Sequence, residues 1–237
     1  MAKLLISDYD GTYKIKGCND VDIKANNSAI EKFINCGNKF VISSGRVYID
    51  VLAEIKKYQI LVSYFSCANG NAIFDNFSNL ISYNKITYKD ILVFKEFFQI
   101  FDYIKSYNPY GEEDNKNIVE FEIRYKNNEA KEKFKKYLLD NCIYNFYHSV
   151  DDPLIIHIFN FKHSKSDSIE MISDIEHIDK NDIYCIGDGY NDLDMIRKYN
   201  GYSIRGTKPD IKKEALGEYN SVADLANDIL EEKVQTK

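Results

Sequence analysis

The spacing of apolar residues divides both ends of the chain into short buried strands and amphipathic helices. Continuous apolar runs predict strands over residues 4–7, 39–42, 61–66 and 182–186, with an edge strand over 201–204. Helical spacing predicts helices that begin at Asn26-Asn27-Ser28, Val47, Asp167, Pro209 and Val222, with an irregular polar connection over residues 13–25. Such alternation is typical of an α/β fold with a parallel sheet.

The pattern changes between residues 83 and 160. Here the chain predicts two successive α-β-β units, with helices over residues 89–101 and 128–139 and strands over residues 102–107, 118–125, 143–148 and 154–160. Two such units favour a small α+β open-faced sandwich inserted into the main domain. The expected organisation is therefore a discontinuous core of residues 1–82 and 161–237 with an inserted cap of residues 83–160.

Composition and charge narrow the classes of function. The chain has 237 residues and a formal net charge of −6, so it carries no basic surface typical of nucleic-acid binding. No apolar segment is long enough for a membrane span. Because a strand is predicted to begin near Lys3, we expect no signal peptide. The five cysteines are scattered without metal-ligand spacing, which indicates reduced thiols. We expect a cytoplasmic protein, a monomer or weak homodimer, whose partner is a small molecule.

The first strand ends in two closely spaced aspartates. Asp8-Tyr9-Asp10-Gly11-Thr12 places Asp8 and Asp10 at the carboxyl end of a buried strand, where ligands of open α/β sheets bind. A carboxylate there can bind Mg²⁺ or attack phosphorus, and a second one can exchange a proton with the leaving group. The alternative is an ordinary turn, because Asp and Gly are common after strands.

Three further segments carry candidate chemistry. Ser43-Ser44-Gly45-Arg46 follows the second strand and offers a hydroxyl, an amide and a guanidinium to a phosphoryl oxygen. The alternative is a helix cap with a solvated Arg46. Gly187-Asp188-Gly189-Tyr190-Asn191-Asp192 follows another strand, and it lacks the spacing of a calcium-binding EF-hand. Lys165 precedes a helix, a place where most lysines are solvated. Asn69-Gly70 is a hairpin signal.

Taken in order, these segments resemble the motifs of the haloacid dehalogenase (HAD) superfamily, specifically its Cof-type phosphatases with a large α/β cap. The resemblance rests on Asp8-Tyr9-Asp10-Gly11-Thr12, Ser43-Ser44-Gly45-Arg46, Cys67-Ala68-Asn69-Gly70, Lys165 and Gly187-Asp188-Gly189-Tyr190-Asn191-Asp192. It implies a Rossmann-like core with a parallel sheet. It also implies magnesium-dependent hydrolysis of a small phosphorylated metabolite, a sugar phosphate or similar compound, through an aspartyl-phosphate.

The resemblance also implies a role for each motif residue. Asp8 would be the nucleophile and a metal ligand, and Asp10 the general acid and base, with its main-chain carbonyl on the metal. Asp188 would complete the Mg²⁺ site, and Lys165 would neutralise charge between nucleophile and phosphate. Asp192 would hold Lys165 or a metal-bound water. The phosphate-binding residues would be Tyr9 and Gly45 through their amides, Ser44, Arg46, Lys165 and Asn191.

Two other functions remain open at this level. A phosphosugar mutase would pass the phosphoryl group to a second sugar hydroxyl instead of water. A catalytically silent phosphate-binding regulatory protein would keep the fold without the chemistry. The sequence alone does not separate mutase from phosphatase.

The cap strand over residues 118–125 alternates in polarity. Its polar face carries Glu120, Glu122 and Arg124, which either contact solvent or close over the catalytic pocket. By resemblance to the family, we predict that one of these three points towards the leaving group of the substrate.

Overall fold

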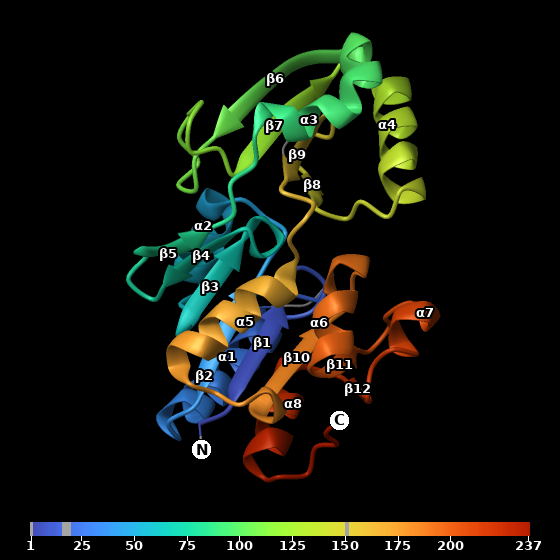
Figure 1. Ribbon diagram of the computed structural model, residues 1–237. Helices are drawn as coiled ribbons and strands as arrows, with labels where there is room; N and C mark the ends of the chain where they lie inside the picture. The colour runs from blue at the N-terminus through green and yellow to red at the C-terminus, as the bar shows by residue number, and fades with distance from the viewer. Residues whose placement is uncertain (1, 16–19, 150–151) are drawn as a thin grey trace.

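The computed structural model describes residues 2–15, 20–149 and 152–237, which form two sheets, one above the other in the view of Figure 1. The larger described sheet has the order β12-β11-β10-β1-β2-β3-β4-β5. Its strands are β1 (Leu4–Asp8), β2 (Lys39–Ser43), β3 (Tyr64–Cys67), β4 (Ala72–Asp75), β5 (Leu80–Tyr83), β10 (Ile183–Gly187), β11 (Asn200–Ile204) and β12 (Glu218–Tyr219). Strands β12 to β3 run parallel, and β4 and β5 are antiparallel additions.

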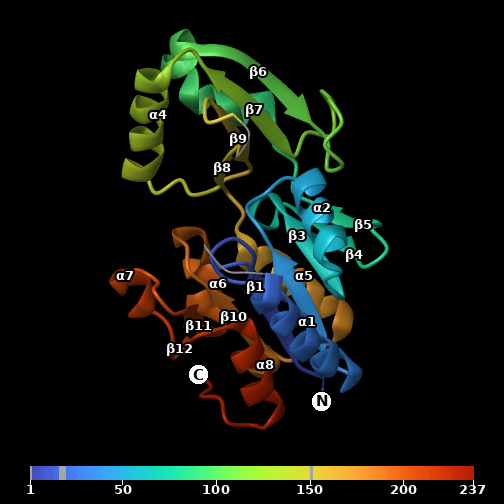
Figure 2. The same cartoon turned by 180° about the vertical axis from the view of Figure 1, so that it is seen from behind.

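The central strand β1 is buried on both faces because helices cover both sides of the sheet. Leu5 packs in the cluster that contains the helices of one face, and Leu4 and Ile6 pack in the cluster of the other. Figure 2 shows α1 and α8 over the first face, and Figure 1 shows α5 and α6 over the second. The core helices are α1 (Asp20–Asn35), α2 (Tyr48–Tyr58), α5 (Lys165–Glu176), α6 (Leu193–Lys198), α7 (Pro209–Lys212) and α8 (Val222–Leu230). The predicted α/β class with a parallel sheet is confirmed.

The smaller sheet lies in the chain between β5 and α5 and has the order β6-β7-β9-β8. Its antiparallel strands are β6 (Phe101–Tyr107), β7 (Glu120–Tyr125), β8 (Phe146–His148) and β9 (Ile155–Phe159). Its apolar face packs against α3 (Tyr88–Ile91), the 3₁₀ helix η2 (Leu92–Ile100) and α4 (Asn128–Asp140), which cover one side only. We call this unit the cap.

Helix α1 begins earlier than the sequence indicated. The predicted irregular connection ends at residue 20, and Ile23 is buried in the core from within the helix. Asn26, expected near the N-cap, lies inside the helix instead. Its amide donates to the Tyr13 carbonyl at 3.0 Å, and its oxygen accepts from the Ala223 amide at 2.9 Å. A buried polar side chain bonded to two other segments is a tertiary feature that helical spacing does not reveal.

Two other expectations change in detail. The predicted helix over residues 89–101 is mostly the 3₁₀ helix η2, whose period of three aligns the buried Ile91, Phe94 and Phe97. Strand β11 is not an edge, because β12 pairs outside it. The four cysteines among the described residues are free thiols, and Cys18 lies outside those residues. No helix in the described part of the chain is both long and apolar enough to cross a membrane.

Candidate active site

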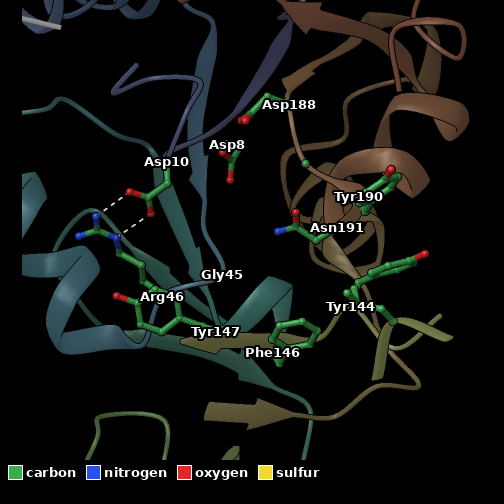
Figure 3. Close-up of a pocket in the computed structure, with 12 residues that line it drawn as sticks. Asp8, Asp10, Gly45, Arg46, Tyr144, Phe146, Tyr147, Asp188, Tyr190 and Asn191 are labelled. Atoms are coloured by element: carbon green, nitrogen blue, oxygen red, sulfur yellow. Dashed lines mark hydrogen bonds and ion pairs between the residues drawn. The ribbon is translucent and has the colours of Figure 1, made fainter. Parts of the chain in front are cut away.

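The chemistry-bearing segments meet at the carboxyl edge of the large sheet. Strands β1 and β2 are in register with Asp8 opposite Ser43, and β10 ends on the other side of β1 at Gly187. A cavity of about 490 Å³ lies between this edge and the cap. Core residues line one side of it, and cap residues from the segment 139–147 line the other (Figure 3).

Asp8 and a buried lysine form the centre of the site. Lys165 is fully buried, and its Nζ donates to Asp8 Oδ1 at 2.6 Å and to Asp192 Oδ1 at 2.7 Å. It occupies the first position of α5, which is fixed by a capping box between Ser164 and Asp167. Burial lowers the pKa of Lys165, but Asp192 and Asp8 outweigh burial and raise that pKa above its ordinary value. Lys165 is therefore a buried cation bonded to Asp8 and Asp192, not a solvated side chain.

The charge around Asp8 is not fully balanced by Lys165. Burial raises the pKa of the Asp8 carboxyl well above its usual range; Lys165 lowers it, and Asp192 and Asp188 raise it further. Asp8 is only 6% exposed, so water relieves little of this repulsion. A divalent cation beside Asp8 would remove it.

The donor set fits Mg²⁺. Carboxylate oxygens of Asp8, Asp188 and Asp192 lie within 4.8 Å of one another, and hard oxygen ligands suit this ion. Asp192 is already engaged, because its Oδ1 accepts from Lys165 and its Oδ2 from the amides of Asp188 and Gly189 at 3.0 and 2.8 Å. Asp8 and Asp188 are thus the better candidates for direct ligands, with Asp192 holding the lysine and the loop.

The Asp188 carboxylate approaches the first strand's turn closely. Thr12 Oγ1 donates to Asp188 Oδ1 at 2.7 Å. A Cβ at position 11 would lie 2.4 Å from Asp188 Oδ2, and Gly11 has a φ of +92°. Only glycine satisfies both conditions, which explains the glycine between Asp10 and Thr12.

Asp10 points away from Asp8 and towards Arg46 (Figure 3). The guanidinium donates through Nε to Asp10 Oδ2 at 2.7 Å and through Nη2 to Oδ1 at 2.6 Å. Arg46 also lies over the Tyr9 ring and 3.8 Å from Glu54 Oε1. Its side chain is 13% exposed, which excludes the alternative of a solvated Arg46.

The predicted phosphate-binding residues are only partly assembled at the cavity. Gly45, Arg46 and Asn191 line it. Ser44 is buried, and its Oγ accepts from the Arg46 amide at 3.1 Å. The Tyr9 side chain is buried with its hydroxyl on Glu54, so only its main chain remains as a phosphate ligand. These phosphate-binding roles stay predictions.

Asn69 contacts the site through Asn191, although the sequence placed it only in a hairpin signal and in one of the five motifs, without a role of its own. It adopts the left-handed conformation (φ 54°) after β3. Its Oδ1 accepts from Asn191 Nδ2 at 2.8 Å, and its Nδ2 donates to the Tyr144 carbonyl of the cap at 3.4 Å. Asn69 thus ties the loop after β10 to the cap. Its place at the carboxyl end of a parallel strand was the signal available in the sequence.

The polar face of β7 does not reach the cavity with its own side chains. Glu120 is buried, and its Oε1 lies 3.3 Å from His157 Nδ1. Glu122 accepts a hydrogen bond from the Tyr103 hydroxyl at 2.8 Å. Arg124 pairs with Asp152. None of the three lines the cavity, so their contact with a leaving group stays a prediction. Tyr147, which shares this face through the pairing of β8, β9 and β7, lines the cavity instead.

The fold of this chain is similar to that of known proteins. Solved structures with similar folds include a haloacid dehalogenase-like hydrolase from B. subtilis (17% identity, TM-score 0.69, covering 96% of this chain and 99% of that one). They also include a putative HAD/COF-like hydrolase from Plasmodium vivax (17%, 0.69, 98% and 96%). A third is a protein from Bacteroides thetaiotaomicron described among phosphatases of the HAD superfamily (18%, 0.67, 98% and 95%).

At these identities the structures show the shared fold. The search of curated proteins finds no match. A family model described as haloacid dehalogenase-like hydrolase matches residues 5–114 and 94–224, which together span most of the sequence. This match confirms the superfamily that the five motifs indicated. The chain belongs to the haloacid dehalogenase-like hydrolase family.

Proposed function

We propose that this hydrolase is a phosphatase that cleaves a small phosphorylated metabolite through an aspartyl-phosphate on Asp8. The observation that carries the proposal is the buried Asp8 carboxylate, held by Lys165 and opposed by Asp188 and Asp192 at the floor of a cavity. Acidic groups around a nucleophile would repel a phosphate dianion unless cations balance them. Lys165 supplies one positive charge, and Mg²⁺, when bound by Asp8, Asp188 and the Asp10 carbonyl, supplies the rest.

The reaction then has two displacements. An Asp8 carboxylate oxygen attacks phosphorus, the bond from phosphorus to the ester oxygen breaks, and Asp10 in its acid form gives its proton to the departing alkoxide. Water next attacks the aspartyl-phosphate and gives a proton to the Asp10 carboxylate, and the bond from phosphorus to Asp8 breaks. Inorganic phosphate leaves and Asp8 is regenerated.

These two steps require the Asp10 side chain to rotate away from the position that it has in this structure. Both of its carboxylate oxygens are bonded to Arg46, which also lines the cavity. Rotation about the Asp10 side chain towards Asp8 would break this ion pair and leave Arg46 available to an anionic group of the substrate.

The proposal is tested first with para-nitrophenyl phosphate. We expect the purified protein to release nitrophenol with Mg²⁺ and to lose this activity in excess EDTA. Asp188→Asn should raise the Mg²⁺ concentration needed for half-maximal rate, since it removes a charged oxygen ligand. The matched variant Asp179→Asn, in the turn before β10, should leave the requirement unchanged. Undiminished turnover in EDTA would show that the acidic cluster serves another purpose.

Asp10→Asn should give a different defect. Its main-chain carbonyl survives, so we expect the Mg²⁺ dependence to persist while kcat falls by about 10²-fold or more, because proton transfer to the leaving group is lost. The loss should be smaller for para-nitrophenyl phosphate than for an alkyl phosphate, because nitrophenolate leaves without a proton. Equal losses on both substrates would contradict the acid role of Asp10.

A further inference from the structure

The cap side of the cavity is built from aromatic rings. Tyr144, Phe146 and Tyr147 line it together with Leu139, and Tyr190 adds another ring from the core side. Figure 3 shows the Tyr144, Phe146 and Tyr147 side chains across the cavity from Asp8 and Asp188. Among the described cap residues, none that lines this cavity carries a side-chain carboxylate, amide or charge.

Neighbouring rings hold each aromatic side chain of this wall. Tyr144 stacks on Tyr190 with centroids 5.6 Å apart and planes at 18°. Tyr147 stacks on His157 at 5.8 Å and 29°, and His157 is itself beside the buried Glu120. Phe146 meets the His148 ring edge-on at 5.5 Å. The wall is therefore preorganised, and its rings lose little further freedom when a ligand binds.

This wall suits a flat apolar group better than a sugar. Each sugar hydroxyl taken out of water needs a hydrogen-bond partner. The described cap side chains that line the cavity offer only the hydroxyls of Tyr144 and Tyr147. The carboxylates of Glu120 and Glu122, which would serve a sugar, are bonded elsewhere. A planar ring, in contrast, gains offset or edge-to-face contacts with the fixed rings beyond the burial of its area.

We propose, on the basis of the phosphatase function above, that the leaving group carries a planar aromatic ring and that Phe146 and Tyr147 select it. The phosphate occupies the end of the cavity at Asp8, and the ring lies against the cap wall. A cavity of about 490 Å³ accommodates both. The substrate proposed here is an aromatic phosphomonoester, whereas the resemblance implied a sugar phosphate, and the experiment below decides between them.

The experiment compares benzyl phosphate with cyclohexylmethyl phosphate. Both are phosphates of primary alcohols with a six-membered carbon ring, so they differ chiefly in planarity and π electrons. We expect kcat/KM for benzyl phosphate to be about tenfold higher than that for cyclohexylmethyl phosphate. It should exceed kcat/KM for glucose 6-phosphate by a larger factor. Phe146→Leu and Tyr147→Leu should each bring the benzyl preference down towards one, mainly by raising KM for benzyl phosphate.

Tyr103→Leu serves as the matched control. It removes a cap tyrosine whose hydroxyl is bonded to Glu122 and which does not line the cavity, so the benzyl preference should remain. Phe146 also packs partly in the cap core, so thermal melting of both leucine variants checks that they fold. If Phe146→Leu proves unstable, the result with Tyr147→Leu decides the test.

The outcomes separate the two proposals. Equal kcat/KM for the benzyl and cyclohexylmethyl esters, or a preference for glucose 6-phosphate, would overturn the aromatic leaving group and leave the phosphatase standing. A benzyl preference unchanged by both leucine variants would also overturn the assignment. Absence of hydrolysis of all three esters and of para-nitrophenyl phosphate would overturn both proposals.

Discussion

The Asp8→Asn variant is expected to lose at least about 10⁴-fold in kcat on any phosphomonoester, because an amide oxygen does not replace the carboxylate as a nucleophile and no other carboxylate occupies its position. The measurement is steady-state phosphate release with Mg²⁺. In the wild type, rapid quenching during turnover should trap the phosphoryl group on Asp8, as detected by mass spectrometry. The variant should show no such adduct.

The fold should survive this change. Asp8 is buried beside Asp188 and Asp192, so a neutral side chain relieves repulsion while Lys165 keeps its bond to Asp192. We expect a melting temperature equal to or above that of the wild type without Mg²⁺. The exposed Asp140→Asn, whose partner is Lys136 on α4, is the control and should leave activity unchanged. Near-normal turnover by Asp8→Asn would refute the covalent route.

Lys165→Met should have the second large effect, on stability as well as activity. Removal of this fully buried ammonium leaves Asp8 and Asp192 without their shared cation, and breaking a buried ion pair from one side typically costs about 3–5 kcal/mol. We expect a loss of that order in the free energy of unfolding, measured by urea denaturation in EDTA, together with loss of phosphatase activity.

The same variant tests the electrostatic reading of the site. Mg²⁺ should raise the unfolding free energy of Lys165→Met more than that of the wild type, because the ion becomes the main positive charge beside Asp8. Lys162→Met is the control, since Lys162 is 66% exposed in its pair with Asp90, and its stability should change little. If the two methionine variants were equally stable in EDTA, Lys165 would not hold the acidic cluster together.

Much of the fold could be predicted from the sequence, because the patterns that indicate strands, helices and helix ends are local. The apolar run of β1 marks a strand buried on both faces. Gly37, which follows α1, has a φ of +86°, the left-handed conformation in which glycine commonly ends a helix. The α-β-β repetition of the cap was legible for the same reason. The predicted bounds of an element were wrong where long-range contacts decide them. Asn26 is the example, because it joins α1 to Tyr13 and to the start of α8.

The site followed the same division. Asp8 and Asp188 were candidates because carboxyl ends of parallel strands share one edge. Lys165 was a candidate only through the resemblance to the family, and the structure brings its ammonium to the same place. The pairing of Asp10 with Arg46 was not predictable, since it depends on side-chain rotamers and on Glu54 from the middle of α2. Proximity of residues in a motif does not specify which partner each one takes.

The sequence by itself determined the layers, the order of the motifs and the carboxylates at the sheet edge, because hydrophobic period and strand ends are properties of neighbouring residues. Only the tertiary structure decided which cap residues face those carboxylates. Alternation within β7 marked Glu120, Glu122 and Arg124, yet a strand on its own does not specify its neighbours. The sheet order β7-β9-β8 places β8 at the edge, and β8 with the segment that precedes it presents Tyr144, Phe146 and Tyr147 to the cavity.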